Sequence, residues 1–250
     1  MPTPIAVTIE YPRVGFPERI HHLGEELGIE VLPLLEDPFP AALDAAGYAA
    51  ELLRRVPGDR DVVLVAALCL GTPIGYHVAR LAAERGGPTP VFVALDGAPV
   101  QVKEVEHAYR TAAERYARAG SPPAVEVTEQ ALLADPAGLV ERMRAELTAL
   151  AATALAPRAE PGAAPPPLVL DLVDAAMDWT VQLVAAHRAG DLPFAGEAVL
   201  VLSDDAAFRD AWPGAARTRH EIVGGSGDDL VGSAGLRRIL ARELAAVTRA

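Results

Sequence analysis

The chain has 250 residues, of which 51% are hydrophobic, and it carries a formal net charge of −12 and one cysteine. This length fits a single domain with an insertion better than two separate folding units. The acidic balance argues against nucleic acid as a partner, because phosphate binding needs clustered Lys and Arg, and one cysteine excludes an internal disulfide framework. The sequence shows no basic segment followed by an apolar signal stretch and no apolar run near the roughly 20 residues that cross a bilayer, so we expect a cytoplasmic protein without membrane contact.

The first part of the chain alternates between apolar, β-branched segments and segments with helical spacing. The expected strands are Ile5–Ile9, Ile29–Leu34, the segment from Val62 into Cys69 and Pro90–Asp96, and the expected helices are Pro17–Leu27, Ala41–Arg55 and Pro73–Arg85. This alternation predicts an α/β fold, with a mostly parallel sheet and helices on both of its faces.

The alternation stops between Val100 and about Phe194, where Ala, Glu, Arg and Leu dominate. The expected helices there are Val102–Ala119, Asp135–Leu155 and Leu168–Arg188, with the Pro-rich connector Arg158–Pro167 before the third; strands return at Glu197–Ser203 and Arg217–Val223, followed by a helix at Ala234–Thr248. The sequence thus predicts a core of residues 1–100 and 195–250 and a helical insertion of residues 101–194. The insertion could simply decorate the surface, but its place directly after the strand that ends in Asp96 favours a lid.

The stretch Ala67-Leu68-Cys69-Leu70-Gly71 has the pattern of a nucleophile elbow, G-x-S-x-G, with Ala for the first glycine and Cys for the serine. Such a turn from strand to helix exposes one side chain above the end of a parallel sheet. At the N-terminus of the following helix, Cys69 is expected to be favoured as a thiolate. The alternative is that this cysteine is a small buried hydrophobe.

A carboxylate, Asp96, ends the strand that follows the elbow helix. In this position it could orient and stabilise a histidine, as the acid of a catalytic triad does. It could also cap a helix or lie solvated at the strand end.

Four features together resemble the α/β-hydrolase thioesterases that release products from polyketide and nonribosomal peptide assembly lines. They are the loop Tyr11-Pro12-Arg13-Val14-Gly15, the elbow at Cys69, Asp96 in the phrase VALDGAP, and Val199–Ser203 followed by Trp212. A cysteine at the elbow is similar to a smaller group of such enzymes, the thioesterase-like Dieckmann cyclases. The resemblance implies an α/β-hydrolase fold with a helical lid.

The resemblance also implies roles for individual residues. The substrate would arrive as a thioester on the phosphopantetheine arm of an acyl or peptidyl carrier protein, and Cys69 would accept its acyl chain. The backbone N–H of Leu70, with that of Arg13 or Val14, would hold the oxyanion, and Asp96 would orient a histidine. No metal or organic cofactor is expected, since paired His or Cys with ligand spacing and a glycine-rich phosphate loop are both missing from the sequence.

The catalytic histidine is where the sequence departs from this family. The family's G-x-H loop corresponds to Ile222–Leu230, and Ser226 stands at the expected histidine position. His220, six residues earlier, is the nearest candidate for the third triad member, although histidines within strands are more often structural. The other histidines are His107 and His187 on the insertion, His77 on the elbow helix, and His21 and His22 on the first helix. Asp228 or Asp229 could cap the last helix or serve as a base.

The serine at the expected histidine position affects which reaction the sequence predicts. Water needs a strong base for its activation, whereas a carbon between two carbonyl groups is more acidic and needs a weaker one. We therefore expect release by Dieckmann-type carbon–carbon closure to a tetramate, tetronate-like or pyridone product. The alternatives are a hydrolytic or lactonising thioesterase and a non-catalytic module that binds carrier proteins.

Overall fold

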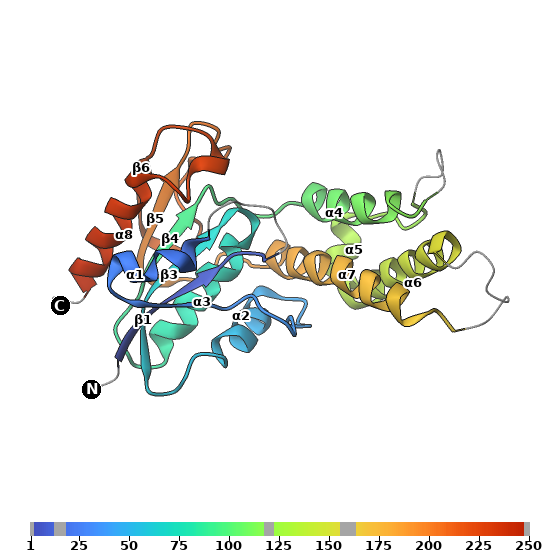
Figure 1. Ribbon diagram of the computed structural model, residues 1–250, viewed down its shortest axis with the longest axis horizontal. Coiled ribbons are helices and arrows are strands. Elements are labelled where there is room, and N and C mark those ends of the chain that lie inside the picture. The colour runs from blue at the N-terminus through green and yellow to red at the C-terminus, as the bar shows by residue number, and fades with distance from the viewer. Residues whose placement is uncertain (1–2, 13–18, 118–122, 156–163, 248–250) are drawn as a thin grey trace.

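The computed structural model describes residues 3–12, 19–117, 123–155 and 164–247. Its centre is a six-stranded sheet in the order β2-β1-β3-β4-β5-β6, with every neighbouring pair parallel (Figure 1). The strands are β1 (Thr3–Ile9), β2 (Glu30–Pro33), β3 (Arg60–Leu68), β4 (Val91–Leu95), β5 (Phe194–Leu202) and β6 (Ala215–Ile222). The predicted α/β class is confirmed, and β3, which carries the elbow, lies inside the sheet.

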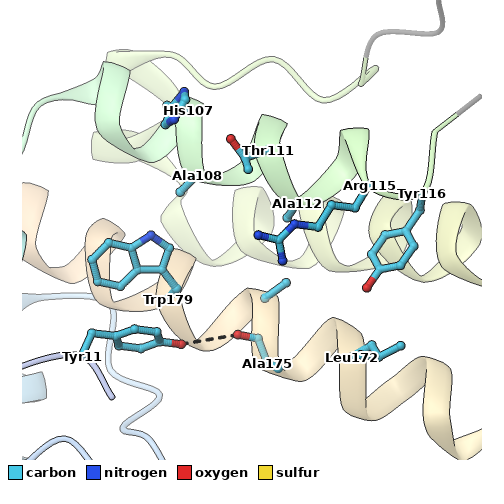
Figure 2. Close-up of a pocket in the computed structure, with 11 residues that line it drawn as sticks. Tyr11, His107, Ala108, Thr111, Ala112, Arg115, Tyr116, Leu172, Ala175 and Trp179 are labelled. Carbon is cyan, nitrogen blue, oxygen red and sulfur yellow. Dashed lines mark hydrogen bonds between the residues drawn. The ribbon is translucent and has the colours of Figure 1, made fainter. Parts of the chain in front are cut away.

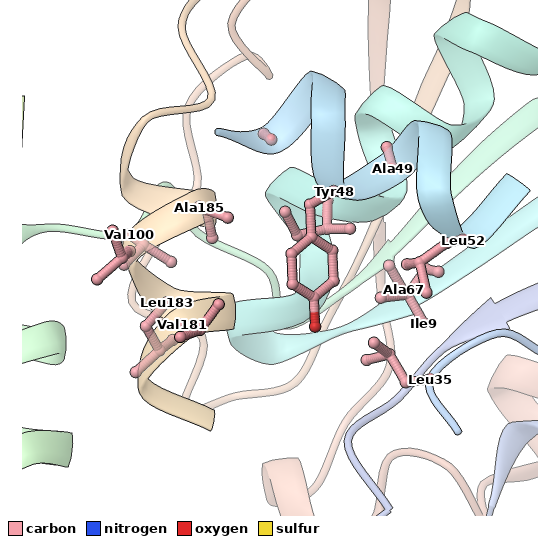
Figure 3. Packing of buried hydrophobic residues seen from close by; sticks show 14 of the residues in the cluster. Ile9, Leu35, Tyr48, Ala49, Leu52, Ala67, Val100, Val181, Leu183 and Ala185 are labelled. Carbon is pink, nitrogen blue, oxygen red and sulfur yellow. The ribbon is translucent and has the colours of Figure 1, made fainter. Parts of the chain in front are cut away.

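Helices cover both faces of the sheet because successive strand side chains point to opposite sides. On one face, Val65 and Ala67 pack with α2 (Ala45–Leu53) and α3 (Thr72–Glu84). On the other face, Ala66 and Leu68 pack with the region of α1 (Gly24–Leu27) and α8 (Ala234–Val247). The Tyr48 ring from α2 fills the first cluster beside Ile9 and Ala67 (Figure 3).

The described part of the insertion between β4 and β5 contains four helices: α4 (Val102–Glu114), α5 (Glu129–Ala134), α6 (Pro136–Leu155) and α7 (Pro167–His187). They extend away from the sheet, and α7 runs back towards it (Figure 1). One face of α6, with Leu139, Met143 and Leu147, packs in the same cluster as Val173 and Met177 of α7. The last turns of α7 contact α2, α3 and the short 3₁₀ helix η2 (Cys69–Gly71), so the insertion is tied to the core at the elbow.

The structure differs from the sequence expectations mainly at element boundaries. The expected helix Pro17–Leu27 is a 3₁₀ helix, η1 (Ile20–Leu23), followed by α1. Helix α2 starts later than expected because the Asp44 side chain accepts a hydrogen bond from the Gly47 N–H at 2.8 Å and caps it. The short helix α5 and the 3₁₀ helix η3 (Gly227–Asp229) were not expected. Most of the Pro-rich connector, residues 158–163, lies outside the described residues.

None of the helices in the described ranges is long and apolar enough to cross a membrane.

Candidate active site

The chain makes the expected turn from β3 into α3 at Cys69. This residue has a φ of 49°, in a region that L residues rarely occupy. Small residues on both sides let the turn close: a Cβ on Gly75, in the first turns of α3, would collide with the Ala67 side chain. The Thr72 hydroxyl donates a hydrogen bond to the Cys69 carbonyl and secures the start of α3. The backbone therefore has the geometry of a nucleophile elbow with Cys69 at its tip.

The expectation of a favoured thiolate is wrong. Burial raises the pKa of Cys69 from 9.0 to about 11, and the nearby carboxylates of Asp96 and Asp228 raise it as well. Burial and the two carboxylates act against the attraction of the α3 N-terminus for a negative charge. At neutral pH the thiol is protonated, so a reaction at Sγ requires a base.

Two hydrogen bonds from one residue orient the Asp96 carboxylate. The Ser203 N–H donates to Oδ1 at 2.7 Å, and the Ser203 hydroxyl donates to Oδ2 at 2.6 Å. Asp96 has a φ of 44°, and its own N–H is bonded to the Val201 carbonyl at 3.0 Å. The resemblance implies a histidine as the partner of Asp96, whereas the structure shows Ser203, a buried serine directly after β5.

His220 does not complete a triad with Cys69 and Asp96. Sheet pairing aligns Ala67 of β3 with Ala94, Leu200 and then His220 across successive strands. Strands are spaced by about 4.8 Å, so the three steps from β3 to β6 separate His220 from the β3 strand by roughly 14 Å. Its Nε2 lies 3.3 Å from the Asp210 carbonyl. The assignment of His220 is therefore corrected: the residue lies on the edge strand, away from the elbow.

Three other histidines have partners elsewhere. His77 is buried on α3, with Nε2 2.7 Å from the Ala189 carbonyl. His187 pairs with the Val100 carbonyl at 3.0 Å and with Glu129 at 3.1 Å. His21 lies 2.6 Å from Glu10. These contacts anchor the polypeptide around the elbow and the insertion.

His107 on α4 lines a cavity together with Leu70 of the elbow. Leu70, His107, Trp179 and Leu183 border this cavity, together with Lys103 and Glu104. The cavity has a volume of about 450 Å³. The sequence places His107 on the insertion, but only the packing of α4 on α7, and of α7 against the elbow, shows which space it lines.

A second cavity, of about 380 Å³, continues along the insertion between α4 and α7 and shares His107 and Trp179 with the first. We call it the insertion groove. Tyr11 and Trp179 lie at one end, with ring centroids 4.7 Å apart, and Arg115, Tyr116 and Leu172 lie at the other (Figure 2). Ala108, Ala112, Ala175 and Ala176 keep the space between the helices open. The two cavities together lead from the elbow into a largely apolar groove.

Gly227, in the segment that corresponds to the histidine loop of the thioesterases that the sequence resembles, lies beside Asp96. A Cβ placed on Gly227 would lie 3.0 Å from Asp96 Oδ2, so a larger residue there would crowd the carboxylate. The Ser226 hydroxyl instead donates to Asp229 at 2.7 Å, and Asp228 lies near enough to influence Cys69.

Of the three expected oxyanion donors, Leu70 follows Cys69 in the elbow, whereas Arg13 and Val14 lie outside the described residues. Hydrogen bonds join the residues before Arg13 to the residues after Val14. Glu10 accepts the Ile20 N–H at 3.0 Å, and the Arg19 guanidinium donates to the Tyr11 carbonyl at 2.9 Å. In the ranges that the structure describes, no three His, Cys, Asp or Glu side chains gather closely enough to hold a metal ion.

Comparison with solved structures identifies proteins of similar fold. The chain is similar to ClbQ from the colibactin NRPS/PKS pathway, with a TM-score of 0.52, 10% identity and 98% of each chain covered. It is also similar to human thioesterase 2, with a TM-score of 0.51, 13% identity, and 98% of this chain and 97% of that chain covered. No protein-family model and no curated protein sequence matches the chain. At these identities the likeness establishes the fold, which is the α/β-hydrolase fold expected from the sequence.

Proposed function

We propose that this protein is an acyl-transferring enzyme of the thioesterase type that releases a carrier-bound polyketide or polyketide-peptide by Dieckmann-type closure. The observation that carries the proposal is the elbow geometry at Cys69, whose next residue, Leu70, borders a cavity that continues into the insertion groove. A phosphopantetheinyl acyl or peptidyl carrier protein would deliver the substrate. The reaction then needs no metal or organic cofactor beyond that arm.

The insertion, acting as a lid, would hold the acyl chain. A chain joined to Cys69 Sγ starts beside Leu70 and can follow Trp179 into the insertion groove, whose alanines leave room between α4 and α7. Apolar walls favour an extended acyl chain by removing its surface from water. The Arg115 guanidinium and the Tyr116 hydroxyl near the other end suit polar oxygens on the chain (Figure 2).

In the first step, His107 takes the proton from the Cys69 thiol, and Sγ attacks the thioester carbonyl. The oxyanion is held by the Leu70 N–H, the pantetheine C–S bond breaks, and His107 returns the proton to the departing sulfur. One thioester replaces another, so the exchange is close to balanced in energy.

In the second step, the carbon between two carbonyls of the bound chain gives its proton to His107. The carbanion attacks the acyl-Cys69 carbonyl, a carbon–carbon bond closes the ring, and the Cys69 sulfur leaves and regains the proton from His107. A carbon acid of this kind needs a weaker base than water does. This difference favours closure over hydrolysis in a site whose Asp96 is bonded to Ser203 and not to a histidine.

Two alternatives predict other outcomes. A hydrolytic or lactonising thioesterase would pass the acyl group from Cys69 to water or to a hydroxyl of the chain. A non-catalytic carrier-binding module is favoured by the raised pKa of the thiol, and would not form an acyl-enzyme at all.

The test incubates the protein with a β-ketoacyl-aminoacyl N-acetylcysteamine thioester and follows protein mass and product together. We expect an acyl adduct on Cys69 and a cyclic product, both absent in Cys69→Ala. Free acid or lactone from an acylated Cys69 would overturn the cyclase in favour of the first alternative. Equal product from wild type and Cys69→Ala, or no adduct with any thioester, would overturn Cys69 catalysis.

A further inference from the structure

Gln182, on α7, has a side-chain amide that is fully buried and bonded to nothing. Its exposed fraction is 0%, and neither Nε2 nor Oε1 has a hydrogen-bond partner. Leaving a buried polar group unpaired costs about 1 to 3 kcal/mol, and most buried amides avoid it. A leucine or methionine would fill this position without that cost, so the amide calls for an explanation.

The amide lies against the elbow. A Cβ placed on Gly71, two residues after Cys69, would be 3.7 Å from Gln182 Nε2 and 3.1 Å from the Ile9 carbonyl. Glycine at this position therefore leaves the space in which the amide approaches the turn. The contact agrees with the packing of α7 on the 3₁₀ helix that starts at Cys69.

Gln182 lies on α7 next to Leu183 and one turn after Trp179, two residues that border the cavity at the elbow. Trp179 and Leu183 line that cavity together with Leu70, and residues three and four apart lie on one side of a helix. Its neighbours Val181 and Leu183 belong to the apolar cluster of Figure 3. In such surroundings a hydrogen bond to a developing negative charge is stronger than in water.

We propose that the Gln182 amide is a side-chain oxyanion donor, supplied by the insertion to the acyl group on Cys69. This inference rests on the proposed function. When Sγ attacks the thioester, the carbonyl oxygen gains the electron pair of the broken π bond; the Leu70 N–H and Gln182 Nε2–H donate to it. When the pantetheine sulfur or, later, the Cys69 sulfur leaves, the carbonyl re-forms and the amide is released.

The variant Gln182→Met keeps the length of the side chain and removes both polar atoms. A catalytic role and a structural role of the amide predict opposite results for this variant. We expect the melting temperature to stay the same or rise, because an unpaired buried group is removed, while the rate of Cys69 acylation falls by about 10²-fold. The acylation rate is measured by intact mass with the N-acetylcysteamine thioester. Gln130→Met, the same change at an exposed position of α5, is the matched control and should alter neither quantity.

Two results would overturn the inference. One is an unchanged acylation rate in Gln182→Met. The other is a rate loss accompanied by a lower melting temperature, which would make the amide structural. Each variant's acylation rate is divided by the rate of the wild-type protein. If the wild-type protein itself is not acylated, the proposed function is refuted, and this result is known before any variant is compared.

Discussion

Ser203 holds both carboxylate oxygens of Asp96, through its N–H at 2.7 Å and its hydroxyl at 2.6 Å. The two residues follow neighbouring strands, β4 and β5, whose carboxyl ends meet at the same edge of the sheet. Hydrogen bonds to an ionised carboxylate are stronger than those between neutral groups. Ser203 thus fixes the direction of the negative charge beside Cys69.

Replacing Ser203 with alanine removes one of these two bonds and should release Asp96 from its orientation. We expect the free energy of unfolding to fall by about 1.5 to 3 kcal/mol, the usual contribution of a hydrogen bond to a charged group, and the acylation rate at Cys69 to change with it. Urea unfolding and intact-mass kinetics measure the two effects.

The control for this variant is Ser233→Ala. The Ser233 hydroxyl accepts the Leu236 N–H at 3.0 Å at the start of α8, and losing it should cost about 1 kcal/mol. This variant should lose stability and keep the acylation rate. If both serine variants showed the same rate per folded molecule as wild type, Ser203 would have no role in positioning Asp96.

The pKa of Cys69 predicts how its reactivity depends on pH. With a pKa of about 11, only about one thiol in 10⁴ is ionised at neutral pH. Alkylation by iodoacetamide should therefore keep rising through pH about 10, well above the range in which an ordinary thiol levels off. A plateau below pH 9, near the ordinary value of 9.0, would contradict the effect of burial.

Asp228→Asn removes a negative charge that raises this pKa. The pKa should fall, the thiolate fraction at a given pH should rise, and alkylation should become several-fold faster. Asp205→Asn, on an exposed residue of the loop after β5, should leave the rate unchanged. An unchanged rate in Asp228→Asn would mean that burial and Asp96 alone set the pKa of the thiol.

Local sequence predicted the elbow because its determinants are local: an apolar strand, Ala67 and Gly71 around Cys69, and a proline in the first turn of α3. The order of strands and helices likewise predicted the fold class. The thiolate was predicted wrongly because the helix terminus is visible in the sequence, whereas burial and the approach of Asp228 depend on tertiary packing.

The partner of Asp96 and the position of His220 depend on which strands are neighbours in the sheet, and the sequence did not predict either. Asp96 meets Ser203 because β4 pairs with β5, a contact between residues 107 positions apart. His220 is the histidine nearest in sequence to the position expected from the resemblance, but it lies on β6, at the edge of the sheet. The groove and the Gln182 contact depend on how α4 and α7 pack, which their amphipathic patterns do not specify.

The proposed path of the acyl chain predicts a change in chain-length preference. Ala176 lines the insertion groove on α7, and Ala176→Phe should fill part of it. Acylation by a dodecanoyl thioester should fall at least tenfold, while acylation by a butanoyl thioester should persist, because a short chain ends before the groove. The ratio of the two rates is the quantity to measure.

Ala149→Phe is the control for this change, since Ala149 is exposed on α6 and lines neither the groove nor the cavity at the elbow. Its ratio of rates should equal that of wild type. If Ala176→Phe also kept the wild-type ratio, the acyl chain would follow another path from Cys69.

The role of His107 is tested by removing the ring and supplying it again in solution. His107→Gln takes away the proposed base at nearly constant side-chain volume, and the cavity of about 450 Å³ that His107 shares with Leu70 can admit a small molecule. A general base contributes about 10² to 10⁴-fold, and we expect cyclic product to fall by at least 10²-fold. Added imidazole should restore part of the rate, because it can take the same proton in the same cavity.

His22→Gln, at an exposed position of η1, should keep the wild-type rate and show no response to imidazole. The pH dependence adds an independent measure: as the pH approaches the thiol pKa of about 11, Cys69 ionises without help, and the deficit of His107→Gln in acylation should shrink. A deficit that is constant with pH and insensitive to imidazole would show that His107 shapes the cavity without moving a proton.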